Sequence, residues 1–416
     1  MIYHRAIRSS EHGPLGAGVV DPLALSPAFA AQWDALALHA SEPNAFAERW
    51  CLAPALQLLD PHRRARLIAV EAAGELIGLL PLTTVTRYGP VPLRHSSNWA
   101  HPNHFHGAPL VRAGHELPFW QALLGWCDSA PGGGALLQLQ RLTENGPLHR
   151  ALTDALALRG QSSTAPVHRE TRALLQSGLT PAAYWDAAVR PKKRKELRRQ
   201  AARLSESGAL LFRHWQPGEV TAPWLDAFLA LEAQGWKGQA GSALASNPAT
   251  QAWARTIILA AAQAGRLDMR MLAQDGAPIA MLINFVCPPG GFAFKTAYAE
   301  DLARFSPGVL LQQANLGLLD HPDLDWVDSC AAPGHPMIDS IWRERRTLVW
   351  VNAAVGGRFQ RLQYAALTRA EAAWRKLRAK SVRAPAQAGA LADESCSLTP
   401  KLRPAPEHRL GLDINP

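Results

Sequence analysis

The chain has 416 residues, 48% of them hydrophobic, and a formal net charge of +9. This length exceeds what one hydrophobic core usually organises, so two domains are expected. No run of about 20 apolar residues occurs, and the first residues lack the apolar core of a secretory signal, so a membrane span and secretion are not expected. The five cysteines show no paired or metal-type spacing, which suits the cytoplasm.

The spacing of apolar residues divides the chain into two similar series of elements. Up to Leu25 we expect mostly loop, with one strand at residues 1–5. The first series then predicts helices at 26–39 and 44–56, hairpin strands 65–70 and 75–84, a strand at 105–111, a helix at 116–129, a strand at 135–141 and a helix at 148–159. The second predicts a strand at 170–176, a helix from Thr180, a basic helix at 191–204, a strand at 210–214, helices at 223–233 and 248–264, hairpin strands 268–273 and 277–286, and strands 292–298 and 325–330. A helical turn at 336–342, an edge strand at 348–352 and a basic helix at 364–377 follow.

The two hairpins indicate an internal duplication. Asp275-Gly276 between two apolar runs is a strong hairpin signal, and Ala73-Gly74 holds the same place in the first series. Helical segments precede each hairpin, and a strand, a helix and another strand follow each one. We therefore expect a duplicated α/β unit.

The segment after residue 298 is suited to binding phosphate. Ser306 is a reasonable N-cap and Pro307 a first-turn residue, so a helix is expected to begin here with Gly308 in its first turn. N–H groups at a helix start attract anions, and Arg304 lies just before them. This bend therefore predicts a site for phosphate oxygens.

This order of hairpin, strand, phosphate-facing helix and strand resembles the acyl-CoA half of GNAT-type N-acetyltransferases. It is most similar to the CelD-like acetyltransferases of polysaccharide-biosynthesis clusters and the Fem-type peptidyl transferases, which carry two GNAT modules in one chain. The segments that carry the resemblance are Leu231–Gly238, Gly241–Ala243, Lys295–Tyr298 and Ser306–Leu311. The family's phosphate loop usually reads Arg/Gln-x-x-Gly-x-Gly/Ala, and this chain has Pro307 and Val309 at its glycine positions.

The resemblance implies an α/β fold with a mixed sheet, built from two tandem GNAT-like units. We place the units at residues 1–165 and 166–360, followed by a C-terminal helix at 361–379 and a disordered tail at 380–416. The second unit is expected to hold the donor, acetyl-CoA or another acyl-CoA, without a metal. The residues expected to bind that donor are Arg304, Ser306, Gly308, Val309 and Leu310.

Three residues are candidates for the chemistry of acyl transfer. Glu232 is predicted to be the general base, directly or through water, although a solvated carboxylate at a helix end is the alternative. Asp328 closes the strand that should face the acyl group, or else serves a turn. Tyr298 is predicted to return a proton to the leaving thiolate. Lys295 lies at odd spacing from Tyr298, so we expect at most one of them to line the cleft.

The acceptor is expected to meet five side chains. Trp236 suits stacking on a sugar ring, or equally a core position, and Lys237 suits an acidic substituent. Lys295 is a further candidate. The segment from His101 to His106 contains three histidines, a number that can bind zinc. GNAT chemistry needs no metal, however, so acceptor binding is predicted for His104 and His106.

Two features stay open. Cys330 with His335 as its base is an unspecific option for an acyl-carrying nucleophile. The basic helix at 190–203 either grips RNA or the CoA phosphates, or is a solvated face of a packed helix. The net positive charge agrees with anionic partners but also follows from an arginine-rich composition alone.

The sequence thus predicts a cytoplasmic acyltransferase that moves an acetyl or other acyl group from acyl-CoA to an amine or hydroxyl. The acceptor is expected to be a small molecule, a sugar nucleotide or a polysaccharide precursor. One alternative is an aminoacyl-tRNA-dependent Fem-type peptidyl transferase, the only version with a nucleic-acid partner. The other is a non-catalytic scaffold of a polysaccharide-biosynthesis assembly, prompted by Pro307 and Val309. The acyl chain length and the oligomeric state stay open.

Overall fold

The computed structural model describes residues 5–8, 14–130, 134–161 and 165–382. The chain divides into two compact parts, one that ends at Ala366 and contains both predicted GNAT-like units, and one that begins at Leu367. Helix α11 (Arg358–Val382) runs from the first into the second and includes the predicted basic helix. The predicted tail lies outside the described residues from residue 383 on, as does the start of the predicted first strand.

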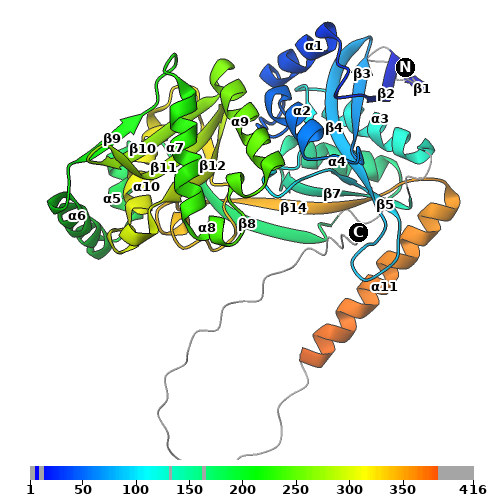
Figure 1. Ribbon diagram of the computed structural model, residues 1–416. Helices are drawn as coiled ribbons and strands as arrows, with labels where there is room; N and C mark the ends of the chain where they lie inside the picture. The colour runs from blue at the N-terminus through cyan, green and yellow to red at the C-terminus, as the bar shows by residue number, and fades with distance from the viewer. Residues whose placement is uncertain (1–4, 9–13, 131–133, 162–164, 383–416) are drawn as a thin grey trace, which may run out of the picture. The chain divides into compact units, whose positions relative to one another are not determined.

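Fourteen strands of the described residues form one mixed sheet (Figure 1). Their order is β1-β2-β3-β4-β5-β7-β14-β8-β13-β12-β11-β10-β9, and β6 pairs with β4. The elements up to residue 158 are β1 (Arg5–Arg8), β2 (Pro14–Val20), α1 (Pro27–Leu38), α2 (Arg49–Leu58), β3 (Arg66–Ala72), β4 (Glu75–Val85), β5 (His95–Asn98), β6 (Leu110–Val111), α3 (Glu116–Ser129), β7 (Leu136–Thr143) and α4 (Pro147–Leu158).

The next elements carry the candidate site. They are β8 (His168–Leu175), α5 (Pro181–Ala188), α6 (Pro191–Glu206), β9 (Leu210–His214), α7 (Thr221–Gln234), α8 (Trp236–Gln239), η1 (Leu244–Ser246), α9 (Pro248–Gln263), β10 (Leu267–Gln274), β11 (Ala277–Cys287), β12 (Gly290–Tyr298), η2 (Glu300–Phe305), α10 (Pro307–Asn315), η3 (Leu316–Asp320), β13 (Trp326–Asp328), η4 (Ile338–Ser340) and β14 (Glu344–Ala354). No helix within the described ranges is long and apolar enough to cross a membrane.

The duplication is present in the structure. The first repeat comprises β2, β3, β4, β5, α3 and β7, and the second repeat comprises β9, β10, β11, β12, α10 and β13. In each repeat four antiparallel strands are followed by a helix and a parallel strand, since β5 pairs with β7 and β12 with β13 in parallel. Both hairpins turn through two left-handed residues, Ala73-Gly74 and Asp275-Gly276. Such turns match the right-handed twist of the strands they join.

The predicted edge strand at 348–352 is not at an edge. It belongs to β14, which lies between β7 and β8 and pairs antiparallel with both. Two other predictions were also wrong. Residues up to Leu25 contain strand β2, and the predicted strand at 105–111 is only β6, whereas the polar strand β5 had no prediction. These strands are short or paired with distant segments, so local apolar spacing identifies them poorly.

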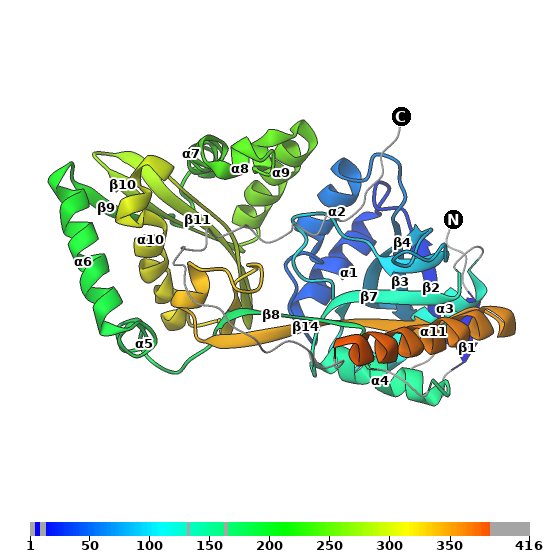
Figure 2. The same cartoon turned by 90° about the horizontal axis from the view of Figure 1, so that it is seen from below.

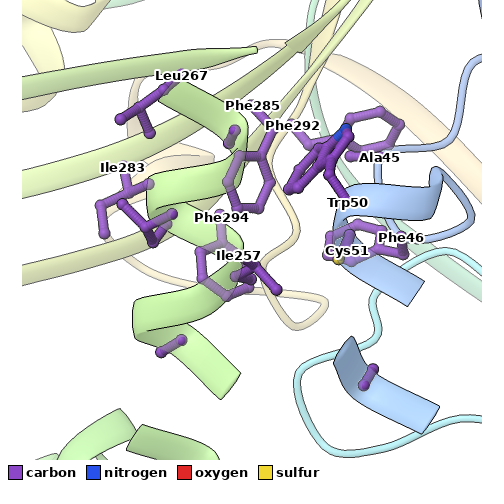
Figure 3. Close-up of a cluster of buried hydrophobic side chains, with 14 of the residues drawn as sticks. Ala45, Phe46, Trp50, Cys51, Ile257, Leu267, Ile283, Phe285, Phe292 and Phe294 are labelled. Atoms are coloured by element: carbon purple, nitrogen blue, oxygen red, sulfur yellow. The ribbon is translucent and has the colours of Figure 1, made fainter. Parts of the chain in front are cut away.

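Helices cover both faces of the sheet (Figure 2). On one face α7 and α9 pack on the second repeat, while α10 and α6 pack on the opposite face. An aromatic cluster joins the two repeats (Figure 3). Phe46 lies 5.6 Å from Phe292 between ring centroids, and Trp50 lies 4.9 Å from Phe285. Since these rings are buried together, the repeats share one core.

Candidate active site

The candidate site is a gap in the sheet between β12 and β13. These strands pair only at Gly290–Phe292 with Trp326–Asp328. Beyond Phe292, β12 continues along β11 to Tyr298, whereas the chain after β13 turns away at Cys330, which has a φ of 52°. The gap opens into a cleft of about 510 Å³. Two separating strands of this kind leave backbone edges to which an extended ligand can bind.

The cleft runs from one face of the sheet to the other. In the register of β12 and β11, Lys295 lies opposite Ile283 and Tyr298 lies opposite Ala280, which belong to cores on opposite faces. Both side chains nevertheless line the cleft. The expectation that only one of them does so was wrong, because the cleft passes around the free edge of β12 and reaches both faces.

On the face of α7, the cleft is lined by aromatic and cationic side chains. They are Phe105, Trp236, Lys237, Phe294 and Lys295. Trp236 is 54% exposed, so its indole stands at the surface and not in a core. Phe105 reaches the cleft from the first repeat, so both repeats contribute to its wall. No signal in the sequence singled out Phe105 within its histidine-rich string.

Lys295 has an unusual environment for a lysine. Its Nζ lies 5.8 Å from the ring centroid of Phe105 and 5.9 Å from that of Phe294. Within the described residues its ammonium group has no hydrogen-bond or ion-pair partner. Burial, and next the charge of Lys237, lower the pKa of Lys295 to about 8. The charged form still predominates near pH 7, and the neutral form, which can accept a proton, increases as the pH rises toward 8.

Glu232 lies beside this lysine but is fully engaged. Its Oε1 accepts a hydrogen bond from Lys237 Nζ at 3.0 Å, and its Oε2 accepts one from the Leu244 backbone N–H at 2.8 Å. Lys237 Nζ also donates to the Thr296 carbonyl oxygen at 2.8 Å. The side chain of Glu232 is buried, so it is not the solvated carboxylate that formed the alternative. This geometry suits a residue that fixes Lys237 against β12.

On the face of α10, Tyr298, Gln312 and Met337 line the cleft, and the predicted phosphate bend lies behind this wall. Ser306 is left-handed with a φ of 54°, and α10 begins at Pro307 without an acidic residue in its first turn. A Cβ on Gly308 would lie 3.1 Å from both Met337 Sδ and Tyr298 Cδ1, two residues that line the cleft. A side chain at this position would press on both residues, so glycine allows the tightest packing here. The start of α10 therefore packs directly against the wall of the cleft.

The other residues predicted to bind the acyl donor differ in how exposed they are. Arg304 is exposed, and its guanidinium carbon lies 4.7 Å from the Phe305 ring centroid. Leu310 is buried in the core beneath α10 and Val309 packs against that core. Their backbone N–H groups both donate to the Ser306 carbonyl oxygen. Gly308 is buried as well, so of the predicted donor-binding residues the exposed Arg304 and the half-buried Ser306 are the most accessible to a ligand.

Asp328 lies in an ionic cluster beneath the cleft. It is fully buried and is not one of the residues lining the cleft. Its Oδ1 lies 2.6 Å from Arg172 Nε, and its Oδ2 accepts from Arg346 Nη1 at 3.1 Å. Burial alone would raise the pKa of Asp328, but these guanidinium groups outweigh it and lower that pKa to about 2. Asp328 therefore suits a structural anion that joins β8, β13 and β14. No pattern in the sequence pointed to either arginine.

His104 and His106 also lie in the protein interior. Both are buried, and the segment that carries them is coil, so they share no strand face. Burial lowers the pKa of His104 to about 4 and of His106 to about 3, which keeps both neutral. Neither lines the cleft, whereas Phe105 between them does. Across the described ranges, no three His, Cys, Asp or Glu side chains converge to hold a metal.

Comparison with known proteins agrees with this arrangement of a mixed sheet opened beside a helix start. Residues 191–329 match the family model described as an acetyltransferase (GNAT) domain. Residues 191–329 therefore carry a GNAT-type domain, and the first half of the chain repeats its order of strands and helix. A search of the curated proteins returned no match.

Solved structures share the fold at low sequence identity. FemX is 9% identical with a TM-score of 0.51, over 80% of this chain and 96% of that one. A conserved protein of unknown function from Bacteroides thetaiotaomicron is 9% identical with a TM-score of 0.50, over 80% of this chain and 98% of that one. At such identities the likeness concerns the fold alone.

Proposed function

We propose that this protein is an acyltransferase that uses the gap between β12 and β13 to move an acyl group from acyl-CoA to a hydroxyl or amine. The observation that carries the proposal is the open gap itself, with the Gly308 bend on one face and Lys295 on the other. A thioester arm that passes through this gap would meet an acceptor on the far face. Acetyl is the simplest acyl group that fits.

The residues on the donor face fit the phosphates of CoA. Gly308 lets the start of α10 pack against the cleft wall formed by Met337 and Tyr298, and the dipole at this helix start favours negative charge nearby. Arg304 is exposed just before this bend and adds a positive charge. Pro307 and Val309 stand where the family has glycines. Gly308 lies between them, at the position where Met337 and Tyr298 approach the backbone most closely.

The chemistry assigned to the site conserves protons and electron pairs. Neutral Lys295 takes the proton of the acceptor hydroxyl or amine as that atom attacks the thioester carbonyl carbon. The new bond forms at this carbon, the carbon–sulfur bond breaks, and the electron pair leaves with sulfur. Tyr298 lines the same cleft, so its hydroxyl is placed to return a proton to the thiolate. Glu232 holds Lys237, or acts as the base itself, as the sequence suggested.

The acceptor proposed here is neutral or anionic. Glu232 pairs with Lys237, but Lys295 has no carboxylate partner among the described residues, so its charged form repels a cationic substrate. Trp236 offers an exposed ring for stacking on a sugar. A sugar nucleotide or polysaccharide precursor in the cytoplasm fits these features.

Calorimetric titration with acetyl-CoA tests the proposal. We expect binding in the micromolar range that is lost in Gly308→Asp, since a carboxylate there would repel phosphate and collide with Met337. Gly178→Asp is the matched control, because a Cβ at Gly178 meets nothing within 4 Å. If Gly308→Asp binds as well as wild type, the donor does not use this bend.

An aminoacyl-tRNA-dependent peptidyl transferase is the second candidate. Two observations favour it, the likeness of fold to FemX and the basic surface of α6. Binding of charged tRNA without any binding of acetyl-CoA would select this candidate. If neither donor binds, the non-catalytic scaffold is left.

A further inference from the structure

Helix α6 presents a basic surface that the chemistry above does not use. Its buried residues, Leu197 and Leu204, belong to the same core cluster as Leu310 and Leu311 of α10. The exposed cations of this helix and the residue before it are Arg190, Lys192, Lys195, Arg198, Arg199 and Arg203. The apolar side therefore fixes α6 beside α10, and the cationic residues are left toward solvent.

The charge pattern of α6 works against the helix itself. Four consecutive cations, residues 192–195, lie in its first two turns, near the helix end where the dipole favours anions, and Asp186 pairs with Arg194 among them. Lys195 and Arg199, and Arg199 and Arg203, are like charges four residues apart, a spacing that destabilises helices. Glu196 offsets part of this through Arg199. A helix face that serves only solubility usually mixes both signs, so this pattern indicates an anionic ligand.

Contacts link this basic helix to the donor face of the cleft. Lys193 Nζ donates a hydrogen bond to Ser340 Oγ, and Ser340 Oγ donates to the Met337 carbonyl oxygen at 2.6 Å. Met337 lines the cleft and lies against Gly308. α6 also contacts η2, which carries Arg304. The first turn of α6 and the phosphate bend are therefore neighbours on one side of the sheet.

We propose that the first two turns of α6, with Lys192 and Lys195, form a second phosphate subsite that binds the distal phosphates of the donor's nucleotide part. This rests on the proposed function, because the same donor would occupy the Gly308 bend. The ligand chemistry is a phosphate ester at the end of an extended nucleotide. The 3′-phosphate of CoA supplies it, and so does the backbone of a tRNA acceptor stem.

The test compares a charge reversal on α6 with the same reversal elsewhere. Lys192→Glu combined with Lys195→Glu changes the subsite, while Arg64→Glu combined with Arg66→Glu changes net charge equally at exposed positions of the first repeat. Binding of CoA, dephospho-CoA and tRNA is measured for full-length protein at low and high salt. A Lys192→Gln, Lys195→Gln variant, with circular dichroism, controls for loss of the helix.

We expect the α6 reversal to weaken CoA about tenfold at low salt and dephospho-CoA much less, with the effect shrinking at high salt. The glutamine variant should fall between, and the Arg64, Arg66 reversal should match wild type. Equal CoA affinity in wild type and the α6 reversal overturns the subsite and leaves the acyl-CoA function standing. Binding of tRNA alone, weakened by the α6 reversal, supports the subsite and overturns acyl-CoA as donor. Absence of binding by all three ligands overturns both.

Discussion

The two repeats share a strand order but differ beside their fourth strand, which is β5 in the first repeat and β12 in the second. In the second repeat, β12 and β13 separate and leave a cleft. In the first, Asn98 closes the equivalent position: its Oδ1 accepts from the Gln140 N–H at 2.9 Å, and its Nδ2 donates to the Gly107 carbonyl oxygen at 2.9 Å. The loop that carries Gly107 thus fills this gap.

The helix starts differ in the same sense. In α3, Glu116 lies in the first turn and its Oε1 accepts a hydrogen bond from the Gly114 N–H at 3.1 Å. The start of α10 has no acidic residue and has Gly308 instead. The first repeat therefore carries a negative charge of its own in the first turn of this helix. We infer that duplication preserved the fold twice and left room for a donor once.

The largest effect is expected from Lys295→Met. Without the base in the second repeat, turnover should fall by about a hundred- to ten-thousandfold while acetyl-CoA affinity is unchanged. Because the base must be deprotonated, the wild-type rate should rise with pH and level off above about 8, and the variant should lose this rise. Lys295→Arg should be equally slow, since arginine stays protonated. An active Lys295→Arg enzyme would show that the positive charge, not proton transfer, matters.

The ionic cluster beneath the gap gives the next prediction. Asp328→Asn should lower the free energy of unfolding by about 3–5 kcal/mol, because it leaves Arg172 and Arg346 without their buried anion. The exposed pair of Asp34 and Arg49 is the control, and Asp34→Asn should cost at most about 1 kcal/mol. Urea denaturation measures both. An equal loss of unfolding free energy in the two variants would mean that the cluster does not hold β8, β13 and β14 together.

The pH dependence of stability follows from the same carboxylate. The pKa of Asp328 is lowered to about 2 in the folded protein, below its value of about 3.9 in an unfolded chain. Its stabilising contribution is therefore fully present above about pH 4 and is lost as pH falls toward 2. Asp328→Asn should lose this acid dependence.

Much of the fold was predictable because its signals are local. The Asp275-Gly276 turn, the helix start at Pro307 and the apolar face of α6 depend on neighbours in the sequence, and each was correctly placed. The position of β14 was not predictable, because its partners β7 and β8 lie some 200 residues earlier. The spacing of apolar residues predicts a single helix or strand, whereas the order of strands in the sheet depends on pairing between segments that are far apart in the sequence.

The candidate site was predictable to a similar extent. Trp236, Lys237, Lys295 and Tyr298 all line one cleft, although at most one of Lys295 and Tyr298 was expected to do so. Asp328 is instead a buried anion, because Arg172 and Arg346 reach it from other strands. A carboxylate at a strand end looks the same in sequence whether it faces a ligand or an arginine. Distant partners decide which it is.

Glu232→Gln separates two roles for the buried carboxylate. If it holds Lys237, turnover should fall by roughly ten- to a hundredfold through misplacement. The negative charge of Glu232 raises the pKa of Lys295, so its removal should lower that pKa. Turnover should then rise at a lower pH than in the wild type. If Glu232 is itself the base, the rise disappears instead. Donor affinity should be unchanged in either case, and unchanged turnover would remove Glu232 from the mechanism.

The closed gap of the first repeat can be tested by overpacking it. A Cβ at Gly107 would lie 2.1 Å from the Gln140 carbonyl oxygen, which is too close for any side chain. Gly107→Ala should therefore destabilise the protein by about 1–3 kcal/mol. Gly178→Ala, whose Cβ meets nothing within 4 Å, should be close to neutral. Equal stability of the two variants in urea would show that the loop yields and the gap is not firmly closed.

The smallest effect is expected at the start of α3. Glu116→Ala removes the carboxylate from the helix start and should cost only about 0.3–1 kcal/mol. The calorimetric stoichiometry of acetyl-CoA should stay at one per chain, because Asn98 and Gly107 still fill the gap beside β5. Glu75→Ala, at an exposed hairpin position, controls for loss of charge. A second equivalent of acetyl-CoA bound by Glu116→Ala would mean that the carboxylate alone had kept the first repeat empty. The difference between the repeats would then lie at the helix start and not in the closed gap.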